Sequence, residues 1–333
     1  RCSTPLPVTK INNFAMKHRK NHLMLLSLLA AGLLTGCSVD EVEESTAQPQ
    51  NAIRMLVNID RQTDTRAATI YEGTTQLSSF KTSAYTTGST TPFVENELVN
   101  YVGNQEWHFV NGPYYWPEIA ALNFFAYAPA DLTNCVVAGD AVSYSAVDGP
   151  SFSATLPATS QGQDGKEEFI YAYVTDKTFE NSGNGVKLDF HHPFATVCFK
   201  LRANNDAVTI NSITIKDVKT SGTFTHAATP QWSNLGGTTD FVATIGQDFA
   251  EVDYEQTVGD IYLVMPQACA NSKQTVIVSY SVDGGTPDEL EAEADVTGWE
   301  AGSRYTYVLA IDTFLKVTVT SITINDWVKY NWQ

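Results

Sequence analysis

The sequence predicts an all-β fold, because its apolar residues past position 50 recur with a period of two, in short runs bounded by turn-forming residues. Many short strands of this kind are typical of a β-sandwich and not of a parallel α/β sheet. The alternating runs are Ile53–Ile59, Val208–Ile215, Val276–Tyr280, Tyr305–Leu309, Leu315–Val319 and Ile322–Ile324.

Length and charge narrow the class of protein. The chain has 333 residues, a hydrophobic content of 43% and a formal net charge of -17, which suits a globular protein of about two domains. Residues 1–36 hold five basic and no acidic residues, so 15 basic residues face 37 acidic ones from Cys37 onward. Such a body repels phosphate backbones, and we therefore expect no nucleic-acid partner.

The basic N-terminal region predicts export. A cationic start at Met16 is followed by an apolar run over residues 23–34, which is short for a transmembrane helix and typical of a signal peptide. Leu34-Thr35-Gly36-Cys37 resembles the bacterial lipobox, and this implies acylation of Cys37 and cleavage just before it. The alternative is an ordinary signal peptide with an incidental cysteine. Residues 1–15 are interpreted as an extension upstream of the true start.

Residues 38–50 are acidic and poor in apolar side chains, so we expect a flexible tether behind the lipid. An acidic cluster in this place resembles a signal for the outer face of the outer membrane, and a plain solvated linker explains it equally well. The sequence thus predicts residues 1–36 as an extension and signal peptide, and residues 37–66 as a tether and a removable first strand.

The segment from Leu188 to Leu201 contains a change of parity in its apolar residues. Because proline cannot donate to a sheet ladder, a bulge or break near His192-Pro193 would repair the register, and we expect one kinked long strand here. A polar run at residues 202–206 follows, and it predicts a domain boundary that divides residues 67–203 from residues 204–333.

No catalytic or metal-binding pattern is apparent. The sequence has no GxSxG, HExxH, phosphate-loop or GxGxxG motif in a suitable context. Adjacent His191 and His192 would point to opposite faces of a strand. Cys135, Cys198 and Cys269 lack metal-ligand spacing and are interpreted as isolated buried thiols. We expect no enzyme activity, cofactor or metal; a surface glycosidase would need a carboxylate pair whose separation the sequence does not give.

Aromatic residues cluster between positions 107 and 127. Alternation from Leu122 to Ala126 favours a core role there. Tyr114, Tyr115 and Trp116 follow Asn111-Gly112-Pro113 in an expected loop and are candidates for an exposed, carbohydrate-binding surface. This is the basis of an alternative function, a glycan-binding lipoprotein of the outer-membrane surface.

Several segments in order resemble the fimbrillin-like family, the subunits and tip proteins of type V pili. No single motif is specific, but together they span nearly the whole exported chain. They are the lipobox ending at Cys37, the strand Ile53–Ile59, Thr65-Arg66-Ala67, Trp116-Pro117, Phe125-Ala126-Tyr127-Ala128-Pro129, Phe190-His191-His192, Leu263–Gln267, Tyr305-Thr306-Tyr307 and Ile324-Asn325-Asp326-Trp327.

The resemblance implies two tandem transthyretin-like β-sandwich domains after a lipoprotein signal peptide. It also implies a place in the outer membrane, cell surface and fimbrium, with other pilus subunits as partners through donor-strand exchange and host or bacterial surface ligands as further partners. Cleavage after Arg66 or Arg61 would sever the strand carrying Ile53, Met55, Val57 and Ile59 together with the lipid on Cys37. The alternative for Arg66 is an exposed loop residue without a role.

Residues 316–333 form a second candidate strand, with Trp327 and Trp332 as large anchors. This segment would either be donated to a neighbouring subunit or close the second domain. The first role suits a stalk subunit, and the second suits a tip or accessory subunit.

Overall fold

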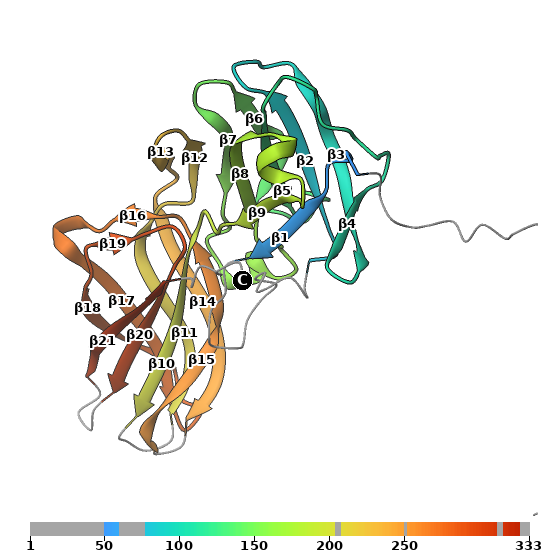
Figure 1. The fold of residues 1–333 in the computed structure, drawn as a ribbon. Helices are drawn as coiled ribbons and strands as arrows, with labels where there is room; N and C mark the ends of the chain where they lie inside the picture. Colours follow the sequence, from blue (N-terminus) through green and yellow to red (C-terminus); the bar gives the residue numbers. More distant parts are fainter. Residues whose placement is uncertain (1–49, 60–76, 204–207, 250–251, 312–315, 327–333) are drawn as a thin grey trace, which may run out of the picture. The chain divides into compact units, whose positions relative to one another are not determined.

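The structure is a computed structural model that describes residues 50–59, 77–203, 208–249, 252–311 and 316–326 (Figure 1). These residues form an all-β fold, as the sequence predicts, with two single-turn α-helices, α1 (Ser160–Gln163) and α2 (Phe179–Ser182), and a 3-10 turn at Ala270–Ser272. Within the described ranges, no helix is long and apolar enough to cross a membrane.

The first sheet contains seven strands that all lie between Met55 and Phe190. Alternate residues of these strands pack into a core that includes Phe80, Phe124 and Phe190, all fully buried. The order of its seven strands is β8 (Ile170–Lys177), β5 (Leu122–Ala128), β2 (Ser79–Thr86), β3 (Pro92–Gly103), β4 (Glu106–Phe109), β1 (Met55–Ile59) and β9 (Val186–Phe190).

Two four-stranded sheets share a second core, to which β10 contributes Val197, Phe199 and Leu201 and β11 contributes Ile213 and Ile215. The sheets thus form a sandwich, the arrangement that the period-two pattern predicts. One holds β15 (Val252–Val264), β10 (Ala195–Ala203), β20 (Ser303–Ile311) and β21 (Val317–Asp326); the other holds β14 (Thr239–Phe249), β11 (Val208–Val218), β17 (Lys273–Val282) and β18 (Asp288–Asp295).

A third core joins segments that are distant in sequence. In it Phe152 and Phe169 pack with Phe224 and Met265. Its sheet pairs Ser221–Thr225 with Ser151–Thr155, so a hairpin that follows β11 completes a sheet begun by earlier strands. The order is β13 (Pro230–Gly236), β12 (Ser221–His226), β7 (Gly149–Thr155) and β6 (Val137–Ser145); β16 (Gln267–Ala268) pairs separately with β19 (Gly298–Trp299).

The prediction of one kinked strand from Leu188 to Leu201 is wrong. β9 ends at Phe190 in the first sheet, and β10 starts at Ala195 in the sheet of β15 and β20. Pro193 has no N–H and so cannot extend the ladder of β9. At the next residue the Phe194 carbonyl accepts from Gly302 N–H at 2.8 Å, just ahead of β10. By sheet membership the chain changes sheets at residues 191–194, ahead of residue 203; the division into domains at residue 203 stays a prediction.

Candidate functional site

The predicted removable strand, β1, lies inside the first sheet and not at its edge (Figure 1). It runs parallel to β9 over five residue pairs, from Met55 opposite Val186 to Ile59 opposite Phe190. On its other side it is antiparallel to β4, with Met55 opposite Trp107. β1 therefore has β9 beside it along its whole length and β4 beside it at Met55.

Pairing begins before β1 itself. The Ile53 N–H donates to the Tyr114 carbonyl at 2.8 Å, and the Trp116 N–H donates to the Asn51 carbonyl at 3.2 Å. The Arg54 carbonyl accepts from Val186 N–H at 2.8 Å. The segment held in the sheet thus extends from Asn51 to Ile59.

One face of this segment is apolar and buried. Ile53, Met55, Val57 and Ile59 are 1%, 2%, 7% and 0% exposed, and they belong to the first core. Each such side chain contributes about 1.5–3 kcal/mol on burial. Their burial is a feature of the structure, whereas their displacement stays a prediction.

The other face of β1 has two specific contacts. The Asn58 side chain is 3% exposed, and its Nδ2 donates to Asp189 Oδ1 on β9 at 3.2 Å. Leu56 lies against Gly185, where an added Cβ would be 2.7 Å from Leu56 Cγ. The sequence indicates neither contact. Asn58 stands where an alternating strand normally has a polar, exposed residue, and the need for a glycine at position 185 follows only from its closeness to Leu56.

Other predicted site residues lie outside the part of the chain that the structure describes. They are Cys37, Arg61, Arg66, Trp327 and Trp332. For the C-terminal segment, the described portion is β21, which pairs with β20 from Val317 opposite Ile311 to Asp326 opposite Ser303. Residues 317–326 are therefore the edge strand of their own sheet.

The expectation of an exposed aromatic surface is wrong for Trp116. Its side chain is 8% exposed and packs edge-on against Phe124, with ring centroids 6.0 Å apart. The chain returns here to pair with Asn51, which draws the indole into the first core. Tyr115 is 44% exposed, and the Tyr114 hydroxyl donates to Glu97 Oε2 at 3.1 Å.

His192, Cys135 and Cys198 are buried, and His192 and Cys198 each lie beside a polar side chain of another strand or loop. His192 Nδ1 lies 2.8 Å from Glu168 Oε1, and both side chains are buried. Burial raises the pKa of the Cys135 thiol to about 11, and Cys198 Sγ lies 3.2 Å from Thr306 Oγ1. In the described ranges, no group of three or more His, Cys, Asp or Glu residues is placed to hold a metal ion.

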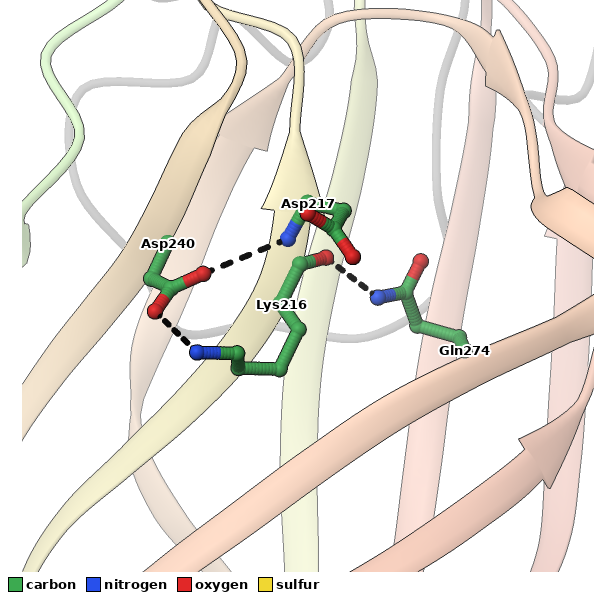
Figure 2. A network of polar contacts seen from close by, with 4 residues as sticks. All are labelled: Lys216, Asp217, Asp240 and Gln274. Atoms are coloured by element: carbon green, nitrogen blue, oxygen red, sulfur yellow. Dashed lines mark hydrogen bonds and ion pairs between the residues drawn. The ribbon is translucent and has the colours of Figure 1, made fainter.

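A polar network links β14, β11 and β17, three neighbouring strands of one sheet around the second core (Figure 2). The Lys216 ammonium on β11 forms an ion pair with Asp240 on β14, and Asp217 N–H donates to the same carboxylate at 3.4 Å. From β17, Gln274 Nε2 donates to the Lys216 carbonyl at 2.6 Å. The hydrogen bond to Asp240 raises the pKa of Lys216. Because the Asp240 carboxylate is paired with Lys216, we interpret this network as a link between strands and not as an acid–base site.

A cavity of about 650 Å³ lies beside the β12–β13 hairpin. Its lining includes Tyr171, His191, Trp232, Trp299 and Glu300. The Trp232 indole N–H donates to the Pro193 carbonyl at 2.6 Å, which holds the ring in place. The sequence alone does not indicate this cavity, because its lining comes from segments as far apart as Tyr171 and Ser303.

Comparisons with known proteins identify the family. A model described as fimbrillin-like matches residues 65–327. A fimbrial protein from Bacteroides vulgatus has a TM-score of 0.60 at 14% identity, covering 83% of this chain and 99% of that chain. A candidate cell adhesion protein from Bacteroides ovatus has a TM-score of 0.54 at 15% identity, covering 85% of this chain and 100% of that chain.

A third solved structure, a candidate cell adhesion protein from Bacteroides uniformis, has a TM-score of 0.50 at 17% identity and covers 83% of this chain and 99% of that chain. No curated protein matches the chain. At these identities the solved structures establish a shared fold. The family model covers most of the sequence, and the chain therefore belongs to the fimbrillin-like family.

Proposed function

We propose that this chain is a structural and adhesive subunit of a bacterial cell-surface pilus of type V. It is exported as a lipoprotein through Cys37, matured by cleavage after Arg66 or Arg61, and assembled with other subunits by donor-strand exchange. Its activity is mechanical and needs no cofactor or catalytic residue.

The observation that carries this proposal is the position of β1. It is an interior strand of the first sheet, yet it precedes all the other strands of that sheet and is joined to them through residues 60–76 alone. One cut in that connection would free β1 without breaking any other strand. The strand's departure would then leave β4 and β9 with facing, unpaired backbone groups.

An empty groove of this kind is strongly unfavourable. Four buried apolar sites correspond to roughly 6–12 kcal/mol of lost burial as an upper bound, before the lost ladder hydrogen bonds are counted. Another extended segment with alternating apolar residues would restore both contributions, as in other cases of strand addition. The proposal therefore links maturation to assembly, because the cut that removes the lipid also creates the binding site.

The match to the family model begins at residue 65, beside the proposed cleavage site at Arg66. Residues before that point then act as a removable segment that tethers the precursor to the outer membrane.

The proposed donor is the end of the chain. Because β21 is already paired with β20, the donated residues would be those after Asp326, with Trp327 and Trp332 as anchors. A stalk subunit would use this segment to enter the next groove. A tip or accessory subunit would only accept a strand.

Limited proteolysis tests the proposal. A low dose of trypsin should trim the purified precursor to a resistant core that begins at Ala67 or Gln62, as read by N-terminal sequencing. Arg66→Ala and Arg61→Ala should remove these products one at a time. Arg54 serves as an internal control, because its carbonyl is bonded within the sheet and the chain there should resist cleavage.

Assembly is the second readout. Cleaved protein should form oligomers whose size grows with concentration, whereas the Arg61→Ala, Arg66→Ala double variant should stay monomeric. A precursor that resists trypsin at both sites, or a cleaved protein that neither oligomerises nor takes up a strand peptide, would contradict the model.

The cavity beside Trp232 keeps a second candidate function open, binding of a surface glycan. Since Trp116 is buried, the appropriate variant is Trp232→Ala, with Tyr115→Ala as a surface control. Glycan binding that is lost only in Trp232→Ala, in a protein that never exchanges strands, would favour this candidate.

A further inference from the structure

The groove that holds β1 has a polar feature that apolar burial does not explain. Asn58 is the polar member of the strand segment Met55–Ile59, and its side chain is almost completely buried. In the parallel pairing of β1 with β9 it lies directly opposite Asp189, and its amide donates to that carboxylate. An amide buried against a carboxylate forms a charge-assisted hydrogen bond, which is stronger than a bond between neutral groups.

A second feature lies two residues earlier on the same face of β1, since alternate residues of a strand share a face. Gly185, just before β9, has no side chain and leaves space for Leu56. Any Cβ at position 185 would collide with Leu56, and the glycine's φ of +136° also disfavours other residues. On the face of β1 that points away from the first core, the groove thus offers space for a long side chain beside Gly185. Two residues further along the bound strand, it offers the carboxylate of Asp189.

These two features solve a problem of register. A strand that slips by one residue turns its apolar side chains away from the core, so burial alone rejects it. A strand that slips by two residues keeps its apolar face inside and restores most backbone hydrogen bonds. The inner sites, which hold Ile, Met and Val, discriminate weakly between such side chains because apolar side chains of similar volume replace one another at small cost.

We infer that Asp189, together with Gly185, selects the register of the strand that fills this groove. The selection requires an asparagine one residue before the last buried apolar position, and it rests on the strand exchange proposed above. A strand of this sequence shifted by two residues would place Leu56 or Asp60 opposite Asp189, and neither side chain supplies the amide donor for this carboxylate. Asp189 is accordingly a specificity-determining residue for the partner strand.

The sequence of the chain supplies a matching partner in a second copy. Val328-Lys329-Tyr330-Asn331-Trp332 has the pattern of Met55-Leu56-Val57-Asn58-Ile59, with asparagine in the same place between two apolar residues. With Asn331 in the position of Asn58, Tyr330 and Trp332 face the sites of Val57 and Ile59, and the core around these sites must widen to admit the larger rings. The alkyl part of Lys329 then takes the space beside Gly185.

The amide–carboxylate pair is first tested in the uncut precursor, where no exchange is needed. Asn58→Leu and Asp189→Leu should each lower the folding equilibrium constant about tenfold or more, because the first removes the amide donor from the half-buried Asp189 carboxylate and the second leaves the buried Asn58 amide without this bond. In the double variant the loss should be clearly smaller than the product of the two. Glu289→Leu, at an exposed carboxylate of β18, is the matched control and should have little effect.

Register selection is then tested on protein cleaved at Arg66. A labelled peptide of residues 51–63 is compared with a peptide of identical composition that carries Leu56→Asn and Asn58→Leu. The native peptide should bind about tenfold or more tightly than the swapped one, and Asp189→Leu should abolish the difference. A peptide of residues 324–333 should show the same dependence on Asn331, tested with Asn331→Leu.

The outcomes separate the two proposals. If peptides enter the groove but the native and swapped forms bind equally, register selection by Asp189 is wrong and strand exchange stands. If no peptide enters, both strand exchange and register selection fail, and the precursor measurements then report only how Asn58 holds β1. Additive effects of Asn58→Leu and Asp189→Leu in the precursor would also overturn the inference.

Discussion

β1 and β21 are similar in sequence but differ in their place in the fold. In both, branched apolar residues recur at alternate positions, with Val57 and Ile59 in the first and Ile322 and Ile324 in the second. β1 has a partner on each side and buries Ile53, Met55, Val57 and Ile59. β21 pairs with β20 alone and leaves Ile324 54% exposed.

The difference shows that a strand's position in the chain does not decide its position in the sheet. β1 is held by a parallel partner, β9, that follows it by more than a hundred residues. β21 lies beside β20, the strand that precedes it.

The largest expected effect tests burial directly. Ile59→Asp should destabilise the precursor by more than about 4 kcal/mol, because it places a charge in the first core without a partner. Ile324→Asp should change the unfolding free energy by less than about 1 kcal/mol. Chemical denaturation measures both. If Ile59→Asp cannot be purified, Ile59→Ala replaces it, with an expected loss of about 2–5 kcal/mol. Equal effects at the two positions would remove the distinction between the strands.

A second pair of variants tests how β1 is anchored at its beginning. Trp116→Ala should cost about 3–5 kcal/mol, because it opens a cavity in the first core beside the backbone that holds Asn51. Tyr115→Ala, next to it on the exposed side, should cost less than about 1 kcal/mol. Thermal or chemical unfolding of the two variants decides the point, and a stable Trp116→Ala protein would show that the indole does not support this pairing.

A smaller effect is expected from pH, and it should act where His226 on β12 contacts Tyr171 on β8 of the first sheet. Burial, with a contribution from the charge of His191, lowers the pKa of His226 below its ordinary value of 6.5. His226 therefore favours the folded state fully above pH 6.5, and this contribution is lost as pH falls through the lowered pKa, because the unfolded chain binds the proton first.

His226 Nδ1 lies 3.1 Å from the Tyr171 hydroxyl, and Tyr171 pairs by its backbone with His191 just after β9. Acid should thus weaken the region beside β1 before that of β21. The measurement is the unfolding free energy between pH 7 and pH 5 in the parent and in His226→Gln. A parallel decline in both proteins would assign the pH dependence to other groups.

Particular residues show how far the sequence could be used to predict this structure. The alternating apolar residues of β1 are predicted, and they are buried. In β5, by contrast, alternation marks Leu122, Phe124 and Ala126 as core, yet all seven residues are buried. Phe125 and Tyr127 face the third core while Phe124 and Ala126 face the first. Nothing local indicates a second apolar layer, because its other members, such as Phe224 and Met265, lie far along the chain.

Two predictions are wrong, the kinked strand from Leu188 to Leu201 and the exposure of Trp116, and both depend on pairing between distant segments. Pro193 indicates an interruption, but only the separate partners of β9 and β10 turn an interruption into a change of sheet. Asn111-Gly112-Pro113 indicates a loop. Trp116 is buried because the chain after that loop pairs with Asn51, which no local pattern indicates. The Asn58–Asp189 contact joins residues 131 positions apart, so no local pattern could have indicated it.

By itself the sequence determined the β fold class, the acidic body behind a basic N-terminal segment, and the family to which the chain belongs, because periodicity, charge and ordered motifs are properties of the chain alone. The tertiary structure decided which alternating run is enclosed by two neighbours and which lies at an edge. That choice depends on pairing between segments far apart in the chain, where burial and hydrogen bonding are gained only when the partners meet.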